Sequence, residues 1–173
     1  LDADSPAAQF RTVLEALDRL PAEDYGLVFT RPNADTSGRG LISILDEYAA
    51  TRRHVAVFAS LGQQVYLSLI AQVDAVVGNS SSGLYEVPSL RKPTIDIGDR
   101  QKGRLAADSV IHCNVVADEI FEAIRKAQGM DCSATVNPYG DGSSVPRIIA
   151  ALKLHRNASA LIKKHFYDMP CDR

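Results

Sequence analysis

The sequence has no long apolar run, few cysteines and no large excess of charge of either sign. No stretch approaches the roughly 20 apolar residues that a membrane-spanning helix needs. The first residues also lack the basic-then-apolar pattern of a targeting signal. The three cysteines are widely spaced and form no C-x-x-C pair, which argues against a disulfide framework and a structural zinc site. We therefore expect a soluble, cytoplasmic protein that makes no contact with a membrane.

The charged and histidine residues exclude two further classes of protein. There are 19 basic and 21 acidic residues, which give a formal charge of −2, and no charged run is long enough for a polyanion groove. The four histidines are scattered and lack a carboxylate or cysteine at ligand spacing. We expect neither nucleic-acid binding nor a bound metal.

The sequence does contain a regular alternation of helix and strand patterns. Ser5 and Pro6 are a good N-cap and first-turn pair for an amphipathic helix over about 5–20. Short apolar runs predict strands at 25–30, 55–58, 75–77, 94–97 and 110–113. Helical patterns cover 41–49, 65–73, 82–90, 118–128 and 145–166, the last with a bend near Arg156-Asn157. This alternation implies right-handed crossovers and a parallel sheet covered on both faces. With 173 residues and 46% apolar content, the chain is expected to form one doubly wound α/β domain over residues 1–173.

Polar loops follow four of the predicted strands, at the sheet edge where open parallel sheets bind ligands. They cover residues 31–35, 60–62, 78–83 and 98–104. The most informative runs from Gly78 to Gly83, with three consecutive serines at a strand-to-helix junction. Free amide N–H groups, hydroxyls and the positive end of a helix dipole all suit an anion. This loop therefore predicts a phosphate or pyrophosphate site.

Two neighbouring features would complete such a site. Glu86 lies four residues after Ser82, about 6 Å further along a helix, where a carboxylate can accept both hydroxyls of a ribose. Arg100 stands with Lys102 and Arg104 in a loop that could neutralise phosphate charge. The alternatives are that Ser82 is an ordinary cap, Glu86 a surface acid and the basic loop merely solvated. The turn cluster at 137–142 is expected to be a tight loop before a helix.

Taken together, these segments resemble the hydrolysing UDP-N-acetylglucosamine 2-epimerases. The motifs that carry the resemblance are Arg31-Pro32-Asn33-Ala34-Asp35, Gly78-Asn79-Ser80-Ser81-Ser82-Gly83, Glu86-Val87-Pro88-Ser89, Lys92-Pro93-Thr94-Ile95, Gly98-Asp99-Arg100-Gln101-Lys102-Gly103-Arg104 and Tyr139-Gly140-Asp141-Gly142. They cover nearly the whole chain in the family's order. The resemblance implies a Rossmann-like domain, the C-terminal half of a glycosyltransferase-B-type two-domain fold. It also implies an isomerase and hydrolase reaction in sialic acid biosynthesis, with no cofactor.

The resemblance also assigns roles to single residues. Ser80 and Ser81 look like the serines that bind the pyrophosphate, Glu86 like the glutamate that binds the ribose, and Arg100 like an arginine of the pocket. Asn33 matches an asparagine of the pocket. Leu61 falls where backbone groups meet the uracil, and Tyr66 where an aromatic side chain lies near the base. The resemblance assigns no side-chain role to Ser82.

One part of the family pattern is missing. The N-terminal domain that supplies the acid and base groups has no counterpart here, and Leu1 is not an initiator methionine. We therefore expect a piece of a longer enzyme that binds UDP or a UDP-sugar but does not turn it over, with its catalytic residues unknown. Its expected partner is the missing domain, and the longer enzyme can form oligomers. A nucleotide-sugar glycosyltransferase of the same architecture and a non-catalytic binding module are the alternatives. The choices between UDP and GDP, and between amino sugars, stay open.

Overall fold

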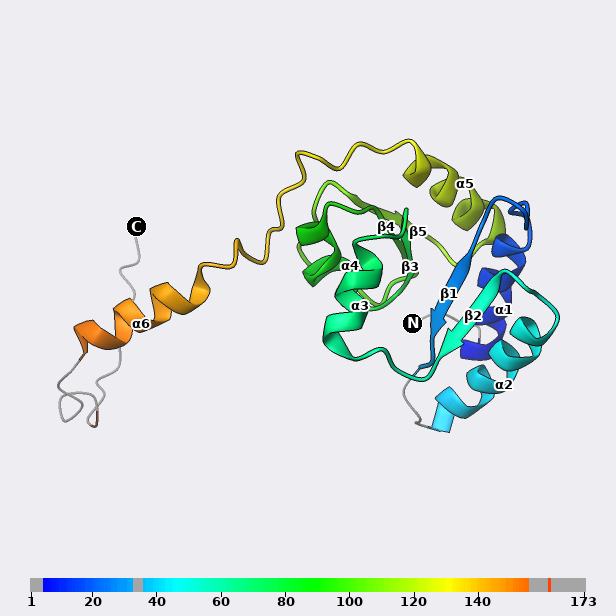
Figure 1. The fold of residues 1–173 in the computed structure, drawn as a ribbon, viewed down its shortest axis with the longest axis horizontal. Coiled ribbons are helices and arrows are strands. Elements are labelled where there is room, and N and C mark those ends of the chain that lie inside the picture. Colours follow the sequence, from blue (N-terminus) through cyan, green and yellow to red (C-terminus); the bar gives the residue numbers. More distant parts are fainter. Residues whose placement is uncertain (1–4, 33–35, 156–161, 163–173) are drawn as a thin grey trace, which may run out of the picture. The chain divides into compact units, whose positions relative to one another are not determined.

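The computed structural model describes residues 5–32, 36–155 and 162. The chain divides into two compact units, residues 1–139 and residues 140–173. The described strands all belong to the first unit, as Figure 1 shows. The expectation of a single domain stays a prediction.

Five short strands form the centre of the first unit. They are β1 (Leu27–Thr30), β2 (Val55–Phe58), β3 (Val76–Gly78), β4 (Thr94–Ile97) and β5 (Val110–Cys113). Strand β1 pairs in parallel with β2, and β3, β4 and β5 form a three-stranded parallel sheet in that order. The parallel α/β fold is therefore confirmed. The strands are hydrogen-bonded in two groups rather than in one sheet. The sequence did not predict this division, because an apolar run indicates a strand without specifying its neighbour.

The helices of this unit overlap the predicted ones. They are α1 (Pro6–Leu17), α2 (Thr36–Ala50), α3 (Gly62–Ile70), α4 (Ser82–Tyr85), the 3₁₀ helix η1 (Val87–Leu90) and α5 (Ala117–Gln128). However, α2 begins at Thr36 rather than at 41 and α3 at Gly62 rather than at 65. Ser5 caps α1 as predicted, since its hydroxyl accepts a hydrogen bond from the Ala8 N–H at 3.2 Å. Acidic residues in the first turn of α5 and basic residues in its last turn match the helix dipole.

Strand β4 is buried on both faces, which places it at the centre of its sheet. Ile95 and Ile97 belong to the apolar core that α1, α2 and α5 also line. On the other face Thr94 meets α4, where its hydroxyl donates to the Gly83 carbonyl at 3.0 Å. Helices α4 and α5 therefore cover opposite faces of β4 (Figure 1). Strands β1 and β2 are covered less completely, since Val28 is 42% exposed and Phe58 is 43% exposed.

The second unit contains helix α6 (Ser144–Leu154). Arg147 pairs with Asp141 at 2.6 Å, within the same unit. Helix α6 ends at Leu154, where His155 leaves the helical conformation with φ −102° and ψ 44°. Nearly all of the predicted continuation to residue 166 lies outside the described residues. The bend predicted near Arg156-Asn157 lies outside the described residues.

No helix among the described residues is both long and apolar enough to cross a bilayer.

Candidate functional site

The loop after β3, which we call the serine loop (residues 79–82), presents free backbone donors. The Ser80 hydroxyl accepts from the Ser82 N–H at 3.3 Å, and the Ser80 carbonyl accepts from the Gly83 N–H at 3.1 Å. Within the part of the chain that the structure describes, the N–H groups of Ser80 and Ser81 donate to no other group. Two adjacent amides are thus available to an anion.

The helix that follows is shorter than the sequence predicts. Helix α4 ends at Tyr85, and η1 begins at Val87 with Glu86 at the junction, where φ is −111°. Pro88 cannot donate a backbone hydrogen bond, which explains the change of helix type. Because α4 has only four residues, a helix dipole contributes little here. Anion attraction must come from the individual amides and hydroxyls.

The loop after β4, which we call the arginine loop (residues 98–104), is tied to the serine loop. The Gln101 side-chain amide donates to the Asn79 carbonyl at 2.7 Å. The loop is also closed on itself, since the Arg104 N–H donates to the Gln101 carbonyl at 3.2 Å. The backbone at Arg100, next to Gln101, is therefore held near the serine loop.

The three cations of the arginine loop, all described by the structure, differ in their partners. Lys102 pairs with Asp99 at 3.2 Å. Arg104 donates to the Tyr85 hydroxyl at 3.1 Å and lies over the Tyr85 ring at 5.7 Å. Arg100 is exposed and has no ion pair among the described residues. The structure thus leaves Arg100 to meet an anion.

Glu86 offers a second free group at the far end of α4. Its side chain is half-buried. No described residue forms a hydrogen bond or ion pair with its carboxylate. The carboxylate is therefore available to accept hydrogen bonds from a ligand.

Helix α3 brings an aromatic side chain to the serine loop. The hydroxyls of Tyr66 and Ser82 lie 2.7 Å apart, and either can be the donor. Leu61 lies one turn earlier, where Gly62 starts α3 with φ +64° and donates to the Ser60 hydroxyl. Tyr66 is therefore beside the serine loop, while Leu61 has no hydrogen bond to it.

Two contacts of this site were not predicted from the sequence. They are the Ser82 contact with Tyr66 and the Gln101 contact with Asn79. The one available signal was a glutamine inside a basic, glycine-bracketed loop. Asn33, the remaining predicted residue, lies outside the described residues. The ligand roles of the predicted residues stay predictions.

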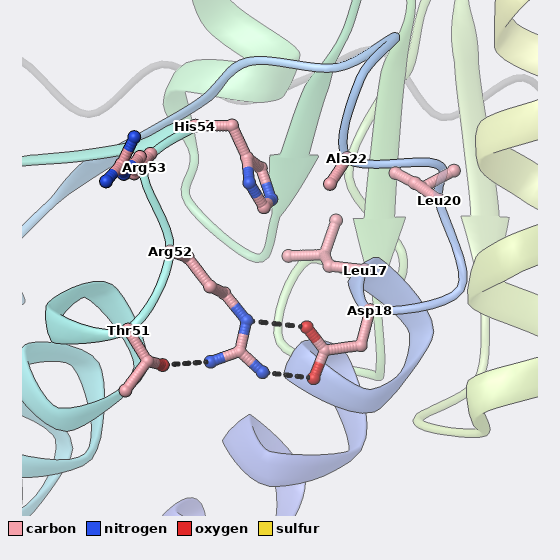
Figure 2. Close-up of a pocket in the computed structure, with 8 residues that line it drawn as sticks. All are labelled: Leu17, Asp18, Leu20, Ala22, Thr51, Arg52, Arg53 and His54. Carbon is pink, nitrogen blue, oxygen red and sulfur yellow. Dashed lines mark hydrogen bonds and ion pairs between the residues drawn. The ribbon is translucent and has the colours of Figure 1, made fainter.

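A pocket of about 470 Å³ lies beside the segments that precede β1 and β2. It is lined by Leu17, Asp18, Leu20, Ala22, Thr51, Arg52, Arg53 and His54 (Figure 2). Arg52 forms a two-pronged ion pair with Asp18, at 2.9 and 2.7 Å, and stacks on Tyr48 at 3.8 Å. Burial and the hydrogen bond to Asp18 raise the pKa of Tyr48 to about 12. The contacts among Asp18, Arg52 and Tyr48 join the end of α1 to α2 and to the turn that follows it.

The described cysteines offer no reactive thiolate. Burial, with the nearby charges of Glu119 and Asp96, raises the pKa of the Cys113 thiol to about 11. Burial also raises the pKa of the Cys132 thiol. Both side chains therefore stay protonated near neutral pH. The loops after β3 and β4 are left as the better site.

Known proteins are similar to this chain in sequence and in fold. Residues 2–153 match the family model described as UDP-N-acetylglucosamine 2-epimerase. A GDP/UDP-N,N'-diacetylbacillosamine 2-epimerase (hydrolyzing) from Campylobacter jejuni is 34% identical over 172 residues, which are 98% of this chain and 44% of that protein. A UDP-N,N'-diacetylbacillosamine 2-epimerase (hydrolyzing) from Legionella pneumophila is 29% identical over 163 residues, 94% of this chain and 42% of that protein.

A solved structure supports the fold. The UDP-GlcNAc 2-epimerase of Methanocaldococcus jannaschii, in complex with UDP-GlcNAc and UDP, is similar with a TM-score of 0.64 at 14% identity. The likeness covers 84% of this chain and 41% of that one, as expected for half of a glycosyltransferase-B-type fold. The chain thus spans less than half the length of the relatives it matches. On the family match and the fold together, the chain belongs to the UDP-N-acetylglucosamine 2-epimerase family.

Proposed function

We propose that the serine loop binds the diphosphate of a UDP-sugar, as the nucleotide-binding half of a hydrolysing UDP-N-acetylglucosamine 2-epimerase. The observation that carries the proposal is the pair of free amides at Ser80 and Ser81, tied through Gln101 to the loop of the unpaired Arg100. Backbone N–H groups and an arginine fork are the usual ligands of phosphate oxygens. The family match supports this function over a glycosyltransferase or a free-standing binding module.

The remaining parts of the nucleotide have candidate partners nearby. The free carboxylate of Glu86 would accept both ribose hydroxyls. Tyr66, held by Ser82 beside the serine loop, would lie near the base, and the backbone at Leu61 would meet the uracil edge. Asn33 completes the proposed set.

The proposed reaction removes the proton at C2 of the sugar and eliminates UDP to leave a glycal. Hydration of the glycal then releases the epimerised free sugar, N-acetylmannosamine when the substrate is UDP-N-acetylglucosamine. In this scheme the described residues stabilise the departing diphosphate, because donors aimed at developing negative charge lower the barrier. The acid and base groups at the sugar belong to the part of the relatives that this chain does not span.

Titration calorimetry with UDP tests the proposal directly. The 173-residue chain should bind UDP. The Glu86→Ala variant should bind UDP at least about tenfold more weakly, because two ribose hydroxyls lose a charged acceptor. The matched control is Glu23→Ala, which removes an exposed carboxylate before β1 and should bind like the wild type.

The two results separate the general proposal from the residue assignment. If the wild-type chain shows no binding of UDP, the proposed nucleotide site is wrong. Unchanged affinity in Glu86→Ala, with UDP still bound, would remove only the ribose role of Glu86.

A further inference from the structure

Gln101 is a buried polar residue that lies outside the apolar core cluster. Only 2% of its surface is exposed. Its side-chain N–H donates to the Asn79 carbonyl, while its side-chain oxygen has no hydrogen-bond partner among the described residues. Burying an amide with an unpaired oxygen is unfavourable, so an apolar side chain would serve a purely structural purpose better.

The position of the bonded carbonyl gives Gln101 a specific effect. Asn79 and Ser80 share a peptide bond, and the structure has no cis peptide bond among its described residues. In a trans peptide the carbonyl and the N–H point in opposite directions. By holding the Asn79 carbonyl from the buried side, Gln101 therefore directs the Ser80 N–H away from itself, at an exposed residue.

A second effect comes from the neighbour of Gln101 in the chain. Arg100 is adjacent to it, so the same hydrogen bond joins the free cation to the serine loop. One side chain thus sets the orientation of a free amide and holds the backbone at Arg100 near the serine loop.

We propose that Gln101 is a positioning residue that prepares the Ser80 amide and Arg100 for the two phosphates of the ligand. The inference rests on the proposed function, because it concerns the same site. Gln101 acts through the backbone and the neighbouring arginine without contacting the ligand. Its loss weakens binding of the diphosphate and leaves binding of the nucleoside unchanged.

The test compares UDP with uridine in Gln101→Met, which keeps the length of the side chain and removes its donor. NMR titration, which reaches weak affinities, measures both ligands. We expect UDP to bind about tenfold more weakly than to the wild type, with uridine affinity unchanged. The control is Gln72→Met, the same change at an exposed glutamine ahead of β3, and it should leave both affinities alone.

Thermal unfolding establishes that each variant is folded, and Gln101→Asn replaces Gln101→Met if the latter is not. The shorter amide keeps the polarity but does not reach Asn79, so the same selective loss is expected. Equal weakening of UDP and uridine would show a general structural role and overturn the inference. Unchanged UDP affinity would overturn it while leaving the proposed function intact, whereas a wild type that does not bind UDP would reject both.

Discussion

At the scale of single residues, Asp96 is the most unusual side chain of the described core. It lies in β4 with 1% of its surface exposed, and one carboxylate oxygen has no hydrogen-bond partner among the described residues. The other oxygen lies 2.8 Å from Nδ1 of His112 on the neighbouring strand β5. Burial raises the pKa of Asp96, and the hydrogen bond and charge of His112 offset only part of that effect. The folded state therefore disfavours the ionised carboxylate.

This pKa shift predicts how stability depends on pH. Because the folded state holds the proton more tightly, the free energy of unfolding falls as the pH rises from the ordinary aspartate pKa of about 4 through the raised pKa. Asp96→Asn removes the titrating group, so it should lose less stability over this range. In mildly alkaline buffer it should be more stable than the wild type by about 1 kcal/mol. Urea denaturation across a pH series measures both effects.

The control for this prediction is Asp24→Asn, the same chemical change at an exposed residue. It should keep the wild-type dependence on pH. An Asp96→Asn variant with that same dependence would contradict the account of Asp96.

At the scale of secondary-structure elements, the serine loop depends on how closely α4 approaches β4. A Cβ atom added to Gly83 would lie 2.6 Å from Cγ2 of Thr94, well inside van der Waals contact. The Thr94 hydroxyl also donates to the Gly83 carbonyl. Glycine at 83 therefore allows the start of α4 to rest on the strand, and this contact determines where the free amides lie.

Gly83→Ala should lower the free energy of unfolding by about 1–3 kcal/mol, because threonine is branched at Cβ and cannot easily move its methyl group aside. Adding Thr94→Ser removes that methyl group and keeps the hydroxyl. The double variant should therefore recover much of the loss. Chemical denaturation of the two single variants and the double variant gives the coupling energy.

A glycine with open space around it provides the comparison. Gly129 has φ −96° and nothing within 4 Å of an added Cβ, so Gly129→Ala should not be destabilised in this way. Additive effects of Gly83→Ala and Thr94→Ser would show that the methyl group is not the cause.

At the scale of the whole molecule, the proposed site lies in a chain that spans less than half the length of its relatives. The chain covers 44% of its Campylobacter relative and 42% of its Legionella relative. Sites formed between two domains lose a wall when one domain is absent. We assign the described residues of the proposed site to the nucleotide, and we assign none of them as an acid or base at the sugar.

The 173-residue chain should therefore bind UDP-N-acetylglucosamine without releasing UDP or free sugar. Incubation followed by chromatography of the nucleotides and the sugars measures turnover, and calorimetry on the same preparation confirms that the site is intact. Release of UDP that increases with the amount of chain, and that Arg100→Ala reduces, would place catalytic groups within these residues.

The sequence by itself determined the type and order of the elements. The strands at 55–58, 94–97 and 110–113 have the predicted bounds, and Ser5 caps the first helix as predicted. These features follow from local patterns, since apolar periodicity, capping and backbone preference act over a few neighbouring residues. The same local patterns, together with the resemblance, located the serine loop.

Only the tertiary structure decided which side chains the site leaves free. Arg100 has no ion pair among the described residues, whereas Lys102 pairs with Asp99 and Arg104 donates to Tyr85, and the sequence alone treats these three cations alike. Likewise, Gln101 reaches Asn79 across 22 positions, and Ser82 reaches Tyr66 across 16. Such contacts depend on how neighbouring strands and helices pack, because a hydrogen bond forms only between atoms about 3 Å apart, whatever their separation in sequence.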